Sequence, residues 1–214
     1  MEFENARNGI RKLFTCQIIE IVIGLLGILI AVLAALFVGS ATAVEAGADE
    51  ATVAAVGAGI GALFAVIALI VLTIVATVLQ IKGLSLARKD EPKYFGGALG
   101  LAVLVLVAQI LRGLGSTVPF LAQFDNYLAG LVPLSTVLLL IMTVLGIKTI
   151  AEKLGRKDIV SMSMPIIIIE SIVYASSAIT GLSDGIMGIV AAVLAFVGYI
   201  IYFVYLAKAK AMFR

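Results

Sequence analysis

The sequence predicts an all-α integral membrane protein with six transmembrane helices, arranged as three antiparallel helical hairpins in one bundle. Two observations carry this prediction. Of the 214 residues, 63% are apolar and 13% are charged, whereas soluble globular domains have about 45–50% apolar and about 25% charged residues. The apolar residues fall into runs of roughly 20, the length that crosses a hydrocarbon core of about 30 Å. These runs do not alternate with polar residues as the strands of a transmembrane barrel do.

Six apolar segments are the predicted spans, and together they make residues 1–214 a single transmembrane domain. Small residues recur at every fourth position of the first span, at Gly27, Ala31 and Ala35, and at a similar spacing in the second. This spacing lets helix backbones approach closely in lipid, so we expect spans one and two to form a tight hairpin. Breaker residues after span three predict a loop with a short interfacial helix. The spans cover about 13–38, 53–81, 96–114, 127–147, 164–181 and 186–206.

The distribution of positive charge predicts the orientation of the chain. Short loops rich in Lys and Arg stay on the cytoplasmic side of a membrane. With six spans, every one of the 15 Lys and Arg residues except Arg112 falls on the same face. Removing one span would scatter these charges over both faces. We therefore expect a multi-pass protein of the cell membrane with both termini in the cytoplasm and the lipid bilayer as its first partner.

The composition excludes several classes of function. The chain has no His and one Cys, so it cannot form a disulfide within itself or a zinc or haem site of the usual His and Cys kind. It also lacks a Ser–His–Asp set, an HExxH motif and a Gly-rich phosphate loop. We therefore expect no enzyme activity, no cofactor and no resident metal. The basic loops are short and set the topology, so nucleic acid is not expected as a partner.

Two carboxylates inside predicted spans are the main candidates for a functional site. A charge within a span is costly and is by default a functional hypothesis. Glu170 lies in span five, where Pro165 is expected in the first helical turn because its missing N–H is harmless there. Glu20 lies in span one at a similar depth. Residues three, four or seven positions away share a helix face, and these are Gln17 beside Glu20, and Tyr174 and Ser177 beside Glu170.

If spans one and five are neighbours, Glu20 and Glu170 share one site. Two adjacent carboxylates cannot both stay ionised easily, so such a pair would hold a proton or bind a cation. The resulting hypothesis is a small-solute or ion carrier, or a subunit of one. The alternative is that each Glu reaches the membrane surface or bonds locally. The protein would then be a non-transporting scaffold or accessory subunit whose small-residue faces bind a second copy or other membrane subunits.

Arg112 and Gln109 form a second, weaker candidate site near the outer end of span three. Arg112 is the one basic residue away from the predicted cytoplasmic face. We expect it to pair with Asp125 or Asp184, or to reach the lipid headgroups with its long side chain. The functional alternative is a site for an anionic solute on the outer side.

Overall fold

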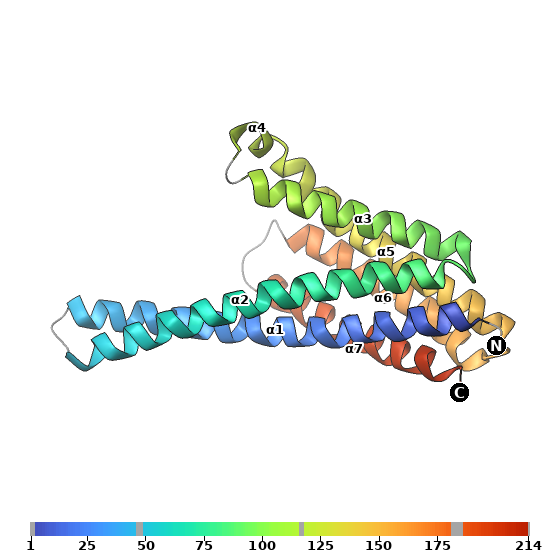
Figure 1. Ribbon diagram of the computed structural model, residues 1–214, viewed down its shortest axis with the longest axis horizontal. Coiled ribbons are helices and arrows are strands. Elements are labelled where there is room, and N and C mark those ends of the chain that lie inside the picture. The colour runs from blue at the N-terminus through green and yellow to red at the C-terminus, as the bar shows by residue number, and fades with distance from the viewer. Residues whose placement is uncertain (1–2, 46–48, 116–117, 181–185, 214) are drawn as a thin grey trace. The chain divides into compact units, whose positions relative to one another are not determined.

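The computed structural model describes residues 3–45, 49–115, 118–180 and 186–213. Within these ranges the chain forms helices and no strand (Figure 1), which confirms the all-α prediction for them. The helices are α1 (Glu4–Glu45), α2 (Asp49–Ala87), α3 (Pro92–Gly115), α4 (Pro119–Ala122), α5 (Asp125–Lys153), α6 (Lys157–Thr180) and α7 (Ile186–Ala211). The short helix α4, with Pro119 in its first turn, lies where a short helix was expected after span three, and its position at a membrane interface stays a prediction.

Among the described residues, four of these helices are long enough and apolar enough to cross a membrane. They are Glu4–Ala35 within α1, Leu63–Ala87 within α2, all of α3 and all of α5. Each contains or overlaps one of the first four predicted spans. The side chains of residues 174–192, which belong to the fifth and sixth predicted spans, lie outside the described part of the chain. The full set of six spans therefore stays a prediction.

The chain divides into two compact units. The first contains residues 1–14 and 80–214, and the second contains residues 15–79. The first unit therefore holds α3 to α7, together with the beginning of α1 and the end of α2. The second unit holds the remaining parts of α1 and α2.

The hydrophobic core of the first unit lies at the helix ends that carry the Lys and Arg residues, which we call the basic end. It is formed by the N-terminal parts of α1, α3 and α6 and the C-terminal parts of α2, α5 and α7. Each of these helix ends contributes at least one side chain with no exposed surface: Ile10, Leu84, Phe95, Ile147, Ile159 and Tyr205. The six long helices are thus tied together at one end by a continuous apolar cluster.

Helices α3, α5, α6 and α7 pack against one another in chain order, and the contacts show opposite directions for α3 and α5. Phe95, at the start of α3, lies against Gly146 near the end of α5, where a Cβ would stand 2.8 Å from the ring. At the far ends of the same helices, Arg112 contacts Asp125. The turn from α5 into α6 is closed by Gly155, whose φ of 69° favours glycine.

Helices α1 and α2 approach each other closely at Gly9 and Gly83, in the first unit. A Cβ added to Gly9 would lie 2.5 Å from the carbonyl oxygen of Gly83 and 2.8 Å from the backbone nitrogen of Ala87. A Cβ on Gly83 would lie 3.0 Å from the carbonyl oxygen of Gly9. The two backbones are therefore in direct contact, and only residues without a side chain fit between them.

The expectation that Gly27, Ala31 and Ala35 mediate this contact is wrong for the described residues. Among them, nothing lies within 4 Å of a Cβ added to Gly27, and Ala31 and Ala35 are exposed. Small residues permit a close approach but do not cause one, because the attraction comes from the surrounding packing. That packing is densest at the basic end, which contains Gly9 and Gly83. The surroundings of the other glycines of the predicted ladder, between residues 39 and 61, lie outside the described part.

Pro165 is not in the first turn of its helix, as the sequence had suggested. Helix α6 begins at Lys157, eight residues earlier, and Pro165 lies inside it. The reason is the short turn after Lys153, which lets the chain resume a helix at once, with Ile159 fully buried in the core. The missing N–H leaves the carbonyl of Ser161 without its usual helical donor, which helices in membranes tolerate.

Candidate functional site

The carboxylate of Glu170 lies against the backbone of α7. A Cβ added to Gly198, a buried residue of α7, would stand 3.2 Å from Oε1 of Glu170 and 3.4 Å from Cγ2 of Val173. Glu170 itself is half-buried. The glycine thus leaves the space that the carboxylate occupies between α6 and α7.

The register between α6 and α7 explains why Glu170 meets Gly198. Ser163 and Tyr205 are in contact across the same pair of helices. Glu170 follows Ser163 by seven residues, and Gly198 precedes Tyr205 by seven, so Glu170 and Gly198 are direct neighbours one level further along, about 10 Å from the first pair. The carboxylate of Glu170 therefore lies at the interface between α6 and α7.

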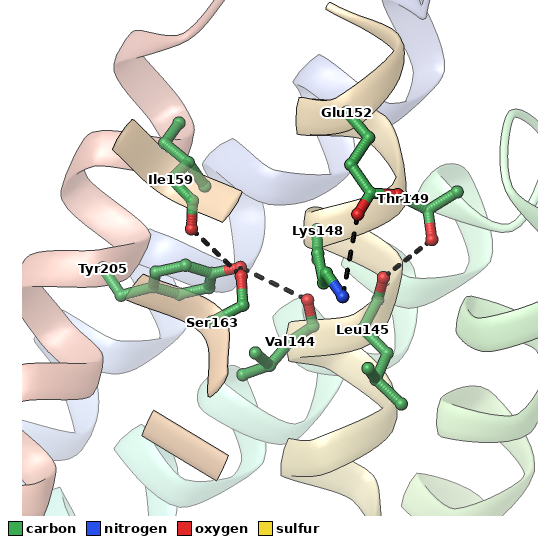
Figure 2. Close-up of polar contacts among 8 residues, drawn as sticks. All are labelled: Val144, Leu145, Lys148, Thr149, Glu152, Ile159, Ser163 and Tyr205. Atoms are coloured by element: carbon green, nitrogen blue, oxygen red, sulfur yellow. Dashed lines mark hydrogen bonds and ion pairs between the residues drawn. The ribbon is translucent and has the colours of Figure 1, made fainter. Parts of the chain in front are cut away.

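A buried pair of hydroxyls links α5, α6 and α7 at the basic end (Figure 2). The Oγ of Ser163 lies 2.9 Å from the hydroxyl oxygen of Tyr205 and 3.0 Å from the carbonyl oxygen of Ile159. The Tyr205 hydroxyl also donates to the carbonyl oxygen of Val144, at 3.2 Å. Each hydroxyl has one proton, so two of the three contacts are hydrogen bonds at any moment and both donors stay paired. Both side chains are fully buried.

Glu20 has a local partner that the sequence analysis missed. The Sγ of Cys16 lies 3.5 Å from Oε1 of Glu20 and 3.3 Å from the carbonyl oxygen of Ala76. The spacing of four residues between Cys16 and Glu20 places them on one helix face, and this signal could have been used. Gln17 is buried, and Glu20 is half-buried. These contacts belong to the second unit and join α1 to α2.

The predicted site residues are not all brought together by what the structure describes. Glu20 belongs to the second unit and Glu170 to the first, so their pairing stays a prediction. The side chains of Tyr174 and Ser177 lie outside the described part of the chain. Within that part, no group of three or more His, Cys, Asp or Glu side chains is arranged to hold a metal ion.

At the other end of α3, the expected ion pair of Arg112 with Asp125 is present. Nε of Arg112 donates to Oδ1 of Asp125 at 2.9 Å, and both side chains are exposed. Gln109 is also exposed, and the alternative partner Asp184 lies outside the described residues. An open pocket beside the pair is lined by Arg112, Gly115, Leu121, Ala122 and Asp125. A carboxylate already neutralises the guanidinium, so a second anion gains little there.

Two acidic residues in the loop between α2 and α3 make contacts that the sequence analysis did not predict. The carboxylate of Asp90 accepts hydrogen bonds from the backbone N–H of Ala6, at 2.6 Å, and from Nδ2 of Asn5, at 3.0 Å. It therefore caps the N-terminus of α1. Glu91 is buried and accepts from Nζ of Lys153 at 3.0 Å. Both carboxylates thus fasten the loop to neighbouring helices.

No protein-family model, curated protein or solved structure matches this chain.

Proposed function

We propose that this chain is a membrane-embedded carrier of a small solute or ion, or a membrane subunit of one, in which Glu170 binds a proton or cation. The observation that carries the proposal is the position of the Glu170 carboxylate against Gly198 of α7. An acidic side chain that had no function within a span would extend towards the membrane surface. The Glu170 carboxylate lies instead against Gly198 of α7, where a small movement of α6 against α7 would change its surroundings.

The topology in this proposal has six spans in three antiparallel hairpins, with both termini on the cytoplasmic side of the cell membrane. The arrangement of the core supports it. Along the chain, the helix ends that enter the core at the basic end alternate between N-terminal and C-terminal, from α1 through α2, α3, α5 and α6 to α7. A chain that crosses a layer six times returns to the same side in this alternating order. The excess of Lys and Arg at that end matches a cytoplasmic face.

The proposal is tested by measuring ion flux in liposomes that contain the purified protein. A potassium diffusion potential drives protons inwards, and an enclosed pH-sensitive dye reports their entry. We expect wild-type protein to raise the rate of entry above that of empty liposomes and Glu170→Gln to abolish the increase. Sodium gradients, followed with a sodium-sensitive dye, test the cation form of the proposal in the same way. Equal flux by wild-type protein and Glu170→Gln, or no flux of either ion, would contradict this role for Glu170.

A second variant tests the position of the carboxylate rather than its charge. In Gly198→Ala, the new Cβ would stand 3.2 Å from Oε1 of Glu170, so the flexible carboxylate must move by a few tenths of an ångström. We expect a reduced flux with an unchanged helical content. Gly100→Ala on α3 is the matched control, because in the described structure nothing lies within 4 Å of an added Cβ there. A normal flux in Gly198→Ala would show that the contact with α7 is irrelevant to transport.

The second candidate is a non-transporting scaffold or accessory subunit. It is favoured by Gly24 and Gly27 of α1, where an added Cβ meets no described atom within 4 Å. Such a face can receive a helix of a second copy or of another membrane subunit. Under this proposal, Gly27→Leu would dissociate a complex seen by native mass spectrometry, and Glu170→Gln would have no effect on it. The carrier proposal predicts instead that Glu170→Gln abolishes the flux and that Gly27→Leu has no effect on it.

A further inference from the structure

Residues 82–93 contain the end of α2, its connection to α3 and the beginning of α3. This segment, which we call the α2–α3 turn, exposes four cationic side chains. They are Lys82, Arg88, Lys89 and Lys93, and all four are exposed. The same stretch contains two acidic residues, so by composition alone half of this charge would be cancelled locally. The contacts of those two acids decide how much positive charge the turn presents.

Both acidic residues are turned towards the protein. Asp90 is held by the backbone N–H of Ala6 and the amide of Asn5, and Glu91 is buried against Lys153. Among the described residues, none of the four exposed cations has a carboxylate within 4.0 Å. The turn therefore presents more positive charge outwards than its sequence indicates.

The neighbouring turn between α5 and α6 behaves differently. There Lys148 is 3.6 Å from Glu152 (Figure 2), and Arg156 binds Asp158 through two hydrogen bonds of 3.1 Å. These hydrogen bonds from Arg156 hold the pKa of the Asp158 carboxyl below its ordinary value, so this acid is ionised at neutral pH. Lys148 and Arg156 are thus each balanced by a carboxylate, whereas Lys157 beside them is exposed and, in the described structure, has no carboxylate within 4.0 Å. The two balanced cations provide a natural control.

The flanking helices place the α2–α3 turn at a membrane surface. Leu63–Ala87 and Pro92–Gly115 are both long and apolar enough to span a bilayer, and only residues 88–91 separate them. A connection this short cannot reach far from the headgroups of the leaflet it faces. Lys93 also lies 5.1 Å from the ring centre of Tyr94, and tyrosine favours this same interfacial depth.

We propose that the α2–α3 turn binds the phosphate headgroups of anionic phospholipids in the surrounding leaflet. Arg88 offers a planar guanidinium that can bind phosphate oxygens in pairs, and the three lysines add point charges around it. The aliphatic stem of Arg88 already lies along α3, with its Cδ 3.6 Å from where a Cβ of Gly96 would be. The head of the side chain is thereby held near the beginning of α3. This binding does not depend on whether the protein transports a solute.

The test compares two double variants of the full-length protein that lose the same net charge. Lys89→Gln with Lys93→Gln removes two cations of the α2–α3 turn that have no carboxylate within 4.0 Å in the described structure. Lys148→Gln with Arg156→Gln removes two paired cations of the α5–α6 turn. Each protein, in a non-ionic detergent, is mixed with equal amounts of phosphatidylglycerol and phosphatidylcholine, and native mass spectrometry gives the ratio of the two lipids bound. All changed residues are at the surface, and far-UV circular dichroism verifies the fold of each variant.

We expect wild-type protein to prefer phosphatidylglycerol over phosphatidylcholine. The preference of the α2–α3 variant should fall about 5-fold for each charge removed, because one basic residue near a membrane surface changes binding by about that factor. The α5–α6 control should keep most of the wild-type preference. Raising the ionic strength should weaken the preference of the wild type. No preference in the wild type, or equal losses in both variants, would overturn the proposal. Displacement of the lipid by an equal concentration of glycerol phosphate would overturn it in favour of a site for soluble phosphate compounds.

Discussion

Replacing Gly9 with alanine tests the close approach of α1 and α2 at the basic end. The added Cβ would lie 2.5 Å from the carbonyl oxygen of Gly83 and 2.8 Å from the nitrogen of Ala87. Ordinary contacts of a Cβ are 3.4–4 Å. Both obstructing atoms belong to the backbone, so no side-chain rotation can relieve the overlap. The two helices must separate by roughly 1 Å, which opens the packing around Ile10 and Leu84.

Two opposing terms set the size of the effect. Alanine favours a helix over glycine by about 1 kcal/mol, and overpacking a close contact costs about 1–3 kcal/mol. Gly9→Ala should therefore lower the free energy of unfolding by up to about 2 kcal/mol. Gly24→Ala is the control in the same helix, because nothing described lies within 4 Å of its new Cβ. It should raise the free energy of unfolding by as much as about 1 kcal/mol.

The measurement is equilibrium unfolding in mixed micelles of a non-ionic detergent and sodium dodecyl sulfate, followed by far-UV circular dichroism. The difference between the two variants isolates the steric term, because the helix preference of alanine is common to both. A Gly9→Ala protein that is as stable as Gly24→Ala would refute the close backbone contact between α1 and α2.

Two further predictions concern polar contacts of the basic end and use the same unfolding assay. Removing the cation of the Lys153–Glu91 pair (Lys153→Met) should lower the free energy of unfolding more than removing the anion (Glu91→Gln). The Glu91 side chain is 8% exposed and would be left without a partner, whereas Lys153 is 48% exposed and can turn to water. An equal loss in the two variants would contradict the burial of Glu91. Tyr205→Phe and Ser163→Ala should each lower the free energy of unfolding by about 1 kcal/mol. The double variant should lower it by about 0.5–1 kcal/mol less than the sum of the two, because the two side chains share one hydrogen bond. Strict additivity would mean that the two hydroxyls do not interact.

The errors in the sequence analysis have specific physical causes. Pro165 was expected at the start of its helix because its own chemistry fits there, but the turn at Gly155 and the buried Ile159 start α6 earlier. The Gly27 ladder has the spacing of a packed face, yet no described atom lies within 4 Å of a Cβ added to Gly27, whereas Gly9 and Gly83 pack between α1 and α2. Spacing reports which residues share a face. It does not report which face meets another helix.

The candidate site likewise has features that the sequence predicts and features that it does not. The sequence identified Glu170 as a costly charge in a span, from its own chemistry and the apolar residues around it. It contained no indication that Gly198 would lie opposite, or that Tyr205 would join Ser163, because these pairs depend on the register of α6 against α7. The Arg112–Asp125 pair was predictable because the two residues flank one short loop, so the connection itself keeps them near each other.

The sequence by itself determined the helical, apolar character of the chain and the concentration of its positive charge at alternate helix ends. These properties follow from the transfer free energies of individual residues and from the length of each apolar run, so they need no knowledge of neighbours. Tertiary structure decided which carboxylates stay outside and which turn inwards. Asp90 and Glu91 are two acids in a basic loop when read along the chain. They become a helix cap and a buried ion pair because Ala6 and Lys153, 84 and 62 residues away, are brought beside them by the core at the basic end.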